Sequence, residues 1–396
     1  FVLIKTMYRL KSQTGGGQDS MTVLKLETGV SCHCWSPDRK QIAVCENSEV
    51  VYIYSNADKA NVKDWKKEHE LKGHDLVVSA IDWSPVHNKI VTCSYDRNAF
   101  VWSLVDGEWK PSLSILRINR AALDVKWSPD GKKFAVASGA KVVPVCHYEE
   151  DNDWWISKMI KKHKSTVIRV AWHPNSQLLL TGSSDFRARV FSAYIEDIDQ
   201  GVDSAFGNTK ETKFGDSLVE FDASNGWVEG VSWSPSGNRL AFVGHDSSVS
   251  FVSFEGDSPV CQTLKSRFLP DEVVMFLSED VAVAAGHTFN PEIYQCEGGS
   301  WRFLGNVDEK GSGGTEKKAA SNFSAARNIW ANKTTRGVDA SKAEDSLWTR
   351  QHNAITDIKA YSTDSGNITS FSTSGLDGRI VIWSKDDLKK VSGLKL

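Results

Sequence analysis

The stretch "KIVTCSYDRNAFVW", residues 89–102, decides the fold. Two short runs rich in β-branched and aromatic residues flank a polar segment, which is typical of two antiparallel strands joined by a tight turn. The same pattern returns in "LLLTGSSDFRARVF" (178–191) and "ITSFSTSGLDGRIVIW" (368–383). In each copy an aspartate precedes the final aromatic residue by six positions: Asp96 and Trp102, Asp185 and Phe191, Asp377 and Trp383. The chain is therefore built from a repeated strand–turn–strand unit.

A second repeated feature involves the tryptophans. Of the 15 in the chain, five stand before Ser-Pro or His-Pro: "CHCWSPD" (Trp35), "AIDWSPV" (Trp83), "DVKWSPD" (Trp127), "RVAWHPN" (Trp172) and "GVSWSPS" (Trp233). Their successive spacings are 48, 44, 45 and 61 residues. Ser-Pro favours a turn, and proline does not continue a central strand. A period in the forties is that of propeller blades, each a four-stranded sheet.

Counting these units predicts seven blades. Five centre on the tryptophans above, one on the degenerate "EVVMFLSEDVAVAAGH" (272–287), and one on "TDIKAY" (356–361) with Trp383. We therefore expect an all-β, seven-bladed propeller over residues 21–396, and we take residues 1–20 as an extension or an expression remnant. The alternating "TVLKLE" (22–27) is predicted to be the outer strand of the last blade, where it would close the ring and protect the sheet edges.

Polar residues recur at fixed places in the units. His74 and His163 each lie 28 residues before the closing aromatic residue, and His352 precedes the last unit. This is the Gly-His…Trp-Asp pattern of WD repeats with the glycine and the aspartate partly lost. Histidine, serine and aspartate together suggest a hydrolase triad, but a nucleophile would occur once, beside an oxyanion site. We predict structural hydrogen-bond anchors and no enzyme activity; the anchors are His74, Ser94, Asp96, Trp102, His163, Asp185, Phe191, Asp246, His352, Asp377 and Trp383.

Composition and motifs argue against several other functions. The net charge of −3 gives no general attraction to nucleic acid, and no apolar run approaches the 18 residues of a membrane span. Seven scattered cysteines with no C-x-x-C pair predict reduced core thiols in a cytosolic protein rather than a zinc site. "GSGGTEKK" (311–318) lacks the ending of a phosphate loop and a preceding strand, so we expect a linker there. No cofactor or metal is predicted.

The period breaks in two places. Residues 196–222 carry eight acidic and two basic residues, and we expect a solvated loop there rather than a docking site. The larger break lies between the sixth and seventh units, where residues 297–350 are predicted to be an insertion. Loops longer than about 15 residues inside a compact domain are usually functional or disordered.

The insertion contains a segment with helical periodicity at residues 319–332. Ala319, Phe323, Ala326 and Trp330 fall on one face, with Ile329 at its edge, which predicts a short amphipathic helix. Residues 310–336 hold six basic residues and one acidic residue. Such a helix either binds an acidic partner with an apolar groove or packs back on its own blades. The predicted partner-binding residues are Lys317, Lys318, Phe323, Ala326, Arg327, Ile329, Trp330 and Lys333.

Several segments are more specific than generic WD-repeat sequence: "DRNAFVWSL", "WKPSLSILRINRAALDVKWSP", "KKFAVASGAK", "NDWWISKMIKK", "VAWHPNSQLLLTGSSDFRARVFSAYI" and "LAFVGHDSSVSFV". From about residue 22 onward the chain resembles the WD-repeat subunit, subunit 1, of the actin-related protein 2/3 complex. The resemblance implies a non-catalytic propeller in a seven-subunit assembly that nucleates branched actin filaments.

Under this resemblance, the partners are two actin-related proteins, four smaller subunits and the actin filament, with nucleation-promoting factors as a further candidate. The family's insertion carries a protruding helix that contacts the mother filament, and Phe323 and Ile329 match its pair of apolar residues six positions apart. The implied location is the actin cytoskeleton of the cytoplasm. The alternative is a generic WD-repeat adaptor or scaffold, such as a substrate receptor of a ubiquitin ligase.

Overall fold

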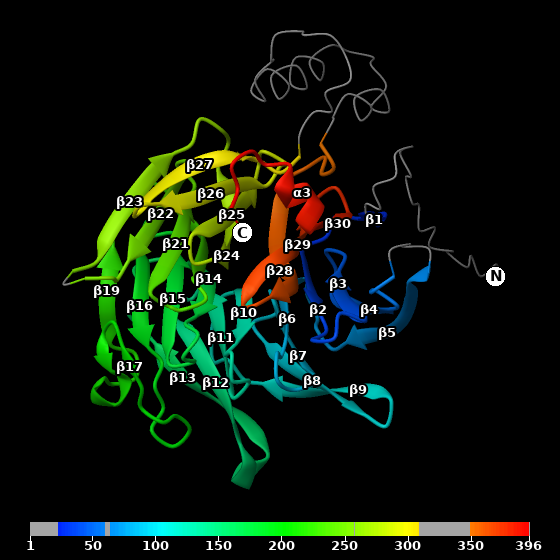
Figure 1. Ribbon diagram of the computed structural model, residues 1–396. Helices are drawn as coiled ribbons and strands as arrows, with labels where there is room; N and C mark the ends of the chain where they lie inside the picture. Colours follow the sequence, from blue (N-terminus) through cyan, green and yellow to red (C-terminus); the bar gives the residue numbers. More distant parts are fainter. Residues whose placement is uncertain (1–22, 60–63, 257, 309–348, 396) are drawn as a thin grey trace, which may run out of the picture.

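The structure is a computed structural model that describes residues 23–59, 64–256, 258–308 and 349–395. Within these residues, seven antiparallel four-stranded units follow one another in chain order around a central channel (Figure 1). The predicted seven-bladed, all-β WD-repeat propeller is therefore confirmed. The second and third units form one continuous sheet, because their outer strands meet at a single residue pair, Ser114 and Trp155.

Each blade runs from an inner strand at the channel to an outer strand at the rim. The first three blades are β2 (Cys32–Trp35), β3 (Gln41–Cys45), β4 (Val50–Ser55) and β5 (Lys66–Lys72); β6 (Val78–Trp83), β7 (Lys89–Ser94), β8 (Ala99–Val105) and β9 (Glu108–Ser114); β10 (Ala122–Trp127), β11 (Lys133–Ser138), β12 (Val143–Glu149) and β13 (Trp154–Ile160). Blades four and five are β14 (Val167–Trp172), β15 (Leu178–Ser183), β16 (Ala188–Ser192) and β19 (Ser217–Phe221); β20 (Val228–Trp233), β21 (Arg239–Gly244), β22 (Ser248–Ser253) and β23 (Val260–Lys265).

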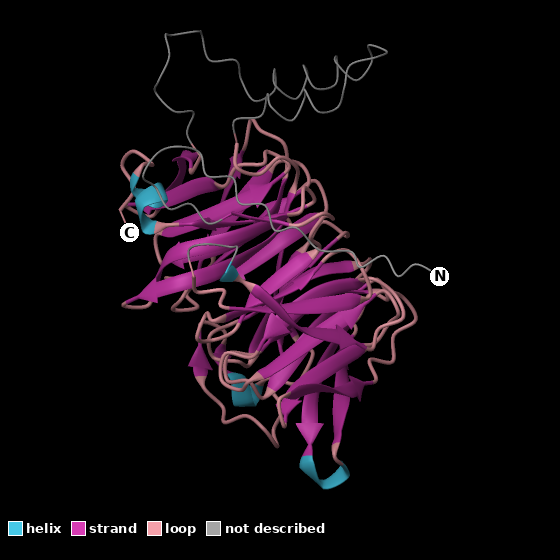
Figure 2. Cartoon of the chain, turned by 90° about the vertical axis from the view of Figure 1, so that its right-hand side faces the viewer, coloured by secondary structure: helices cyan, strands magenta, loops and turns pink. Residues whose placement is uncertain are grey.

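Blades six and seven complete the ring. They are β24 (Asp271–Ser278), β25 (Val281–Gly286), β26 (Glu292–Glu297) and β27 (Ser300–Asn306); β28 (Ile355–Asp364), β29 (Asn367–Gly375), β30 (Arg379–Trp383) and β1 (Val23–Lys25). Among the described residues, the remaining elements are the small hairpin β17 (Asp203–Ser204) and β18 (Gly207–Asn208), the short helices η2 (Glu150–Asn152) and η3 (Thr209–Glu211), and α3 (Lys385–Lys389). Figure 2 shows how little of the described chain is helical.

Strand β1 is the outer strand of the last blade, as predicted from "TVLKLE". Val23 pairs with Val381 and Leu24 with Ile380 in an antiparallel ladder. Leu24 is fully buried, in a cluster that also contains Trp35 of the first blade. The two ends of the described chain thus join the first and last blades, and the last blade is left with a short, protected outer strand.

The hydrophobic core is divided among the spaces between neighbouring blades. Trp172 of β14 clusters with Val143 and Ile160 of the third blade. Trp83 of β6 clusters with Cys32 and Cys45 of the first blade. Each tryptophan of the Trp-Ser-Pro repeat therefore fills the gap to the preceding blade, which explains why the repeat needs a large apolar residue at that place.

The insertion begins later than predicted. Residues 297–306 belong to the sixth blade rather than to the predicted insertion 297–350. Strand β27 (Ser300–Asn306) is the outer strand of that blade and pairs with β26. Gly298 and Gly299 form the turn between the two strands, and both have positive φ angles, 59° and 80°. A two-residue hairpin turn of this kind requires positive φ at both positions, which glycine adopts without strain. The Gly-Gly pair was the signal that could have placed this strand.

The acidic segment 196–222 is also more structured than the predicted solvated loop. It contains the β17–β18 hairpin and β19, the outer strand of the fourth blade. Asp199 lies buried against Lys133 of β11, whose ammonium group also sits 5.4 Å from the centre of the Trp172 ring. The extra residues therefore fasten the fourth blade to the third, because a buried ion pair holds both segments in one arrangement.

Candidate functional site

The predicted anchors of the second blade form a continuous hydrogen-bond chain. The Trp102 indole donates to the Thr92 hydroxyl at 3.0 Å, Thr92 contacts Nε2 of His74 at 2.8 Å, and Nδ1 of His74 contacts Asp96 at 2.8 Å. Because the indole only donates and the ionised carboxylate only accepts, this order places the imidazole proton on Nδ1, facing the carboxylate. Burial lowers the pKa of His74, which favours the neutral ring. The chain ties a loop to a turn and exposes no nucleophile.

Ser94, a predicted anchor, is not a link between His74 and Trp102 in this hydrogen-bond chain. Its hydroxyl donates to the Leu76 carbonyl at 2.8 Å and accepts from the Asp96 backbone N–H at 3.1 Å. The hydroxyl that links the histidine to the tryptophan belongs to Thr92, two residues earlier. Side chains alternate across a strand, so residues two apart share a face, and the sequence left the choice between them open.

The fourth blade keeps only part of this arrangement. His163 contacts the Thr181 hydroxyl at 3.0 Å, but Phe191 replaces the indole and offers no hydrogen bond. Asp185 pairs with the buried Arg189 at 2.9 Å and accepts from the Lys164 backbone N–H. Burial, with the charge of Arg189 adding to it, lowers the pKa of His163 to about 4.

In the last blade, the prediction for His352 was wrong by one residue. Trp383 donates to Thr373 as Trp102 does to Thr92, but the residue that reaches Thr373 from the loop is Gln351. His352 contributes its backbone N–H to Asp377, the contact that Asp75 makes in the second blade. A glutamine amide can replace an imidazole here because it also donates and accepts hydrogen bonds.

Asp246 occupies the corresponding turn of the fifth blade. It accepts from the Asn225 backbone N–H at 3.0 Å, from the Ser224 and Ser248 hydroxyls, and from Lys265. Burial acts to raise the pKa of Asp246, but Lys265 and Ser248 outweigh it and hold that pKa at about 2. The predicted histidine, serine and aspartate anchors thus lie at or beside the turns and loops on one face of the propeller, hereafter the anchor face, and Trp102, Phe191 and Trp383 lie further along the third strands.

The connection from β27 to β28 leaves and returns on this face, and its two ends are fastened together. The Arg350 backbone N–H donates to Asp308 at 2.6 Å, and the Arg350 guanidinium lies 3.4 Å from the same carboxylate. That guanidinium also donates to Asp387 of α3 at 2.6 Å and covers the Trp383 ring at 4.7 Å. Asn290 exchanges two hydrogen bonds with the Asp308 backbone, at 2.8 and 2.9 Å. We call Asn290, Asp308, Arg350, Trp383 and Asp387 the root clamp.

Sequence reasoning did not find the root clamp, whose central pair lies 42 residues apart. The eight predicted partner-binding residues, 317 to 333, and the predicted helix 319–332 lie outside the described residues. The structure therefore describes the base from which the insertion starts.

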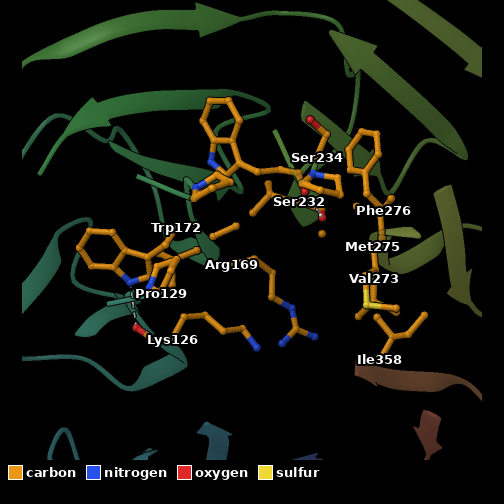
Figure 3. A pocket seen from close by; sticks show the side chains of 18 of the residues that line it. Lys126, Pro129, Arg169, Trp172, Ser232, Ser234, Val273, Met275, Phe276 and Ile358 are labelled. Atoms are coloured by element: carbon orange, nitrogen blue, oxygen red, sulfur yellow. Dashed lines mark hydrogen bonds between the residues drawn. The ribbon is translucent and has the colours of Figure 1, made fainter. Parts of the chain in front are cut away.

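A cavity of about 530 Å³ opens into the channel beside the Trp-Ser-Pro turns (Figure 3). Trp127, Trp172 and Trp233 line it, and the side chains of Lys126 and Arg169 extend into it. Both cations lie 3.8 Å from a carboxylate oxygen of Asp124, and Asp357 also lines the cavity, so two cations face two carboxylates there. Among the described residues, no three metal-binding side chains come together, and no helix is long and apolar enough to cross a membrane.

The family model "WD domain, G-beta repeat" matches residues 65–103, 155–192 and 215–253. Each match begins in or near the outer strand of one blade and ends at the third strand of the next. The sequence repeat is therefore displaced by one strand from the structural blade, so that each repeat links two blades.

Relatives that match almost the whole chain are all named as forms of subunit 1 of the actin-related protein 2/3 complex. Actin-related protein 2/3 complex subunit 1B of Arabidopsis thaliana is 44% identical over 94% of this chain and 98% of its own length. Subunit 1A-A of Xenopus laevis is 44% identical over 93% of this chain and 97% of its own length. Subunit 1 of Schizosaccharomyces pombe is 36% identical over 89% of this chain and 96% of its own length.

Proposed function

The chain belongs to the family of actin-related protein 2/3 complex subunit 1, and from this premise we propose that it is a non-catalytic propeller subunit of such a complex. Its partners would be two actin-related proteins and four smaller subunits, with nucleation-promoting factors as a further class. Its location would be the actin cytoskeleton of the cytoplasm. The anchor networks support a structural role, because their polar groups are used to join loops to turns.

We further propose that the insertion contacts the side of the mother filament. The apolar stripe of Phe323, Ala326, Ile329 and Trp330 would enter a groove on an actin subunit, and Lys317, Lys318, Arg327 and Lys333 would face its acidic surface. One observation carries this proposal: the root clamp joins Asp308 to Arg350, so the insertion starts and ends at one fixed point on the propeller.

The clamp matters for the energy of the contact. Burying two or three such side chains stabilises the contact by roughly 1.5–3 kcal/mol each, but the loss of conformational entropy in about a dozen ordered residues offsets much of that free energy. A fixed base on the assembled complex raises the effective concentration of the insertion near the filament, so a contact that is weak alone becomes useful.

The test is a branching assay with reconstituted complex carrying Phe323→Ala and Ile329→Ala together. We expect normal assembly of the complex, but a loss of about tenfold or more in filament co-sedimentation and a matching fall in branch density. Neutralising Lys317, Lys318, Arg327 and Lys333 should have a milder effect that shrinks at higher salt, because exposed charges are screened.

The matched control is Ser324→Ala with Asn328→Ala, which alters the polar face of the same predicted helix. It should branch and co-sediment like the unaltered complex. If the double-alanine variant of Phe323 and Ile329 also does so, the stripe packs on its own propeller and the filament contact is refuted.

A further inference from the structure

The outer strands of the second and third blades meet in a seam at the rim of the propeller. Ser114 of β9 pairs in parallel with Trp155 of β13, and the Ser157 hydroxyl donates to the Ile115 carbonyl at 3.3 Å. In the part of the chain that the structure describes, no other two blades share a sheet. The β8–β9 and β12–β13 hairpins project from the rim on either side of it (Figure 1). The seam therefore holds residues of two blades side by side on the outside of the ring.

Large apolar side chains lie exposed along this seam. Every second residue from 109 to 115 is apolar, so these side chains share one face of β9. The first, Trp109, packs against Trp83 with ring centres 5.5 Å apart, but Leu113 is 47% exposed and Ile115 is 57% exposed. Trp154, at the start of β13, is 53% exposed. Because Leu113 and Trp154 each directly precede a residue of the parallel pair, they lie on the same side of the joined sheet.

Basic side chains continue this surface where both strands reach the anchor face. The connections 115–121 and 161–166 and the turn 138–142 contain six basic residues and no acidic one. They are Arg117, Arg120, Lys141, Lys161, Lys162 and Lys164, and all are exposed. The three segments lie together, because the Gly139 backbone N–H donates to the Ala121 carbonyl at 3.0 Å and Val143 pairs with Ile160. The ion pairs of the described chain include none of these six cations.

The other end of the apolar row is acidic. The turn 149–153 between β12 and β13 carries four acidic residues, and Glu149 accepts a hydrogen bond from the Trp154 indole at 3.1 Å. The surface therefore runs from an acidic turn, across exposed apolar side chains, to a basic end at the anchor face. We call Leu113, Ile115 and Trp154, together with the six basic residues, the seam surface.

The seam surface favours a permanent protein partner. Adjacent large apolar side chains left in water promote aggregation, so a cluster of them marks a surface that is covered in the assembled state. Cations without acidic partners beside such a cluster favour a partner that brings carboxylates to that end. The seam is also built from "WKPSLSILRINRAA" and "NDWWISKMIKK", two of the stretches that go beyond generic WD-repeat sequence. Closing a propeller does not by itself require exposed apolar residues there.

We propose that the seam surface is the docking site of another subunit of the complex, an inference that rests on the proposed function. The docking segment would place apolar side chains on Leu113, Ile115 and Trp154, and carboxylates opposite the basic residues at the anchor face. Nucleic acid and anionic membranes are disfavoured, because their phosphates would also meet the acidic turn 149–153. An activator that binds only transiently would leave the apolar row in water for most of the time.

The test is reconstitution of the complex by co-expression of the full chain with the other subunits. Ile115→Ser with Trp154→Ser should reduce recovery of the chain in the complex at least tenfold. The melting temperature of this variant, purified alone, should stay the same, because both side chains are more than half exposed. The matched control is Val260→Ser with Leu376→Ser, which changes side chains that are 62% and 50% exposed on other blades and should assemble normally.

Charge neutralisation tests the basic end separately. Replacing Arg117, Arg120, Lys161 and Lys162 by glutamine should weaken assembly at low salt, and the deficit should shrink as salt rises, because exposed charges are screened. Hydroxyl-radical footprinting adds a readout that a loss of stability would not produce. Trp154 should be oxidised readily in the free chain and at least tenfold more slowly in the complex.

Equal recovery of the Ile115/Trp154 variant, or equal oxidation of Trp154 in the free chain and in the complex, would overturn the proposal. So would a variant that assembles normally but loses binding of an activator, because the surface would then belong to a transient partner. If the unaltered chain does not enter the complex, the proposed function itself is refuted, and this inference with it. The Phe323/Ile329 variant should assemble normally, so the filament contact is tested independently.

Discussion

At the scale of single residues, the turn aspartates each accept several hydrogen bonds. Asp96 accepts from Nδ1 of His74 and from the backbone N–H groups of Asp75 and Asn98. Replacing Asp96, Asp185 or Asp377 by alanine should lower the free energy of unfolding by about 1–3 kcal/mol, because buried donors lose their acceptor. The Asp185 variant should suffer most, since Arg189, which is only 2% exposed, would keep only the partly exposed Glu220 as an acidic partner.

Urea and thermal unfolding of the purified chain measure this effect, with the exposed Glu108→Ala as control. Filament binding should change little in the three variants. A melting temperature that stays the same in all of them would contradict the structural role of the aspartates.

Glu292 gives a prediction for pH dependence. It is fully buried, and burial raises its pKa from 4.5 to about 7, although the Tyr294 hydroxyl donates to it at 2.8 Å. Between these two pKa values the folded state binds more protons than the unfolded state, so this residue lowers stability as pH rises through that window. The buried Asp271 nearby has its pKa raised as well, by burial and by the charge of Glu292.

Glu292→Gln keeps an acceptor for Tyr294 and removes the ionisation. We expect it to increase the free energy of unfolding at pH 8 by up to about 3 kcal/mol, and to give no such gain at pH 4. Unfolding measured across this range, with the exposed Glu49→Gln as control, decides the matter. A variant that is less stable than the unaltered chain at pH 8 would show that Glu292 is held as a carboxylate by partners.

At the scale of elements, the short strand β1 completes the last blade and closes the ring. Its three residues supply the outer strand of the last blade, and Leu24 is fully buried. Leu24→Ala should lower the free energy of unfolding by about 2–5 kcal/mol and expose the edge of β30. Thermal unfolding and light scattering test this, with the exposed Glu27→Ala as control. Unchanged stability would mean that the ring does not depend on β1 for closure.

At the scale of the whole molecule, the proposed filament contact starts from the anchor face. The root clamp lies in the connection between β27 and β28. Inner strands packed around one channel hold that place in a fixed relation to the other blades. A filament bound to the insertion would therefore be held in a set position relative to the whole propeller.

The sequence by itself determined the repeat, the number of blades, the closing strand and the family. These features depend on local patterns, because strand alternation, Trp-Ser-Pro turns and six-residue Asp-to-aromatic spacings are visible within a few residues. The Gly298–Gly299 turn was equally local, and it was missed because the sixth unit is degenerate. Only the tertiary structure decided that Thr92 and Gln351 complete the anchor chains, and that Arg350 meets Asp308. Those contacts join residues that are far apart in sequence, and packing between blades, rather than local periodicity, sets which side chains face one another.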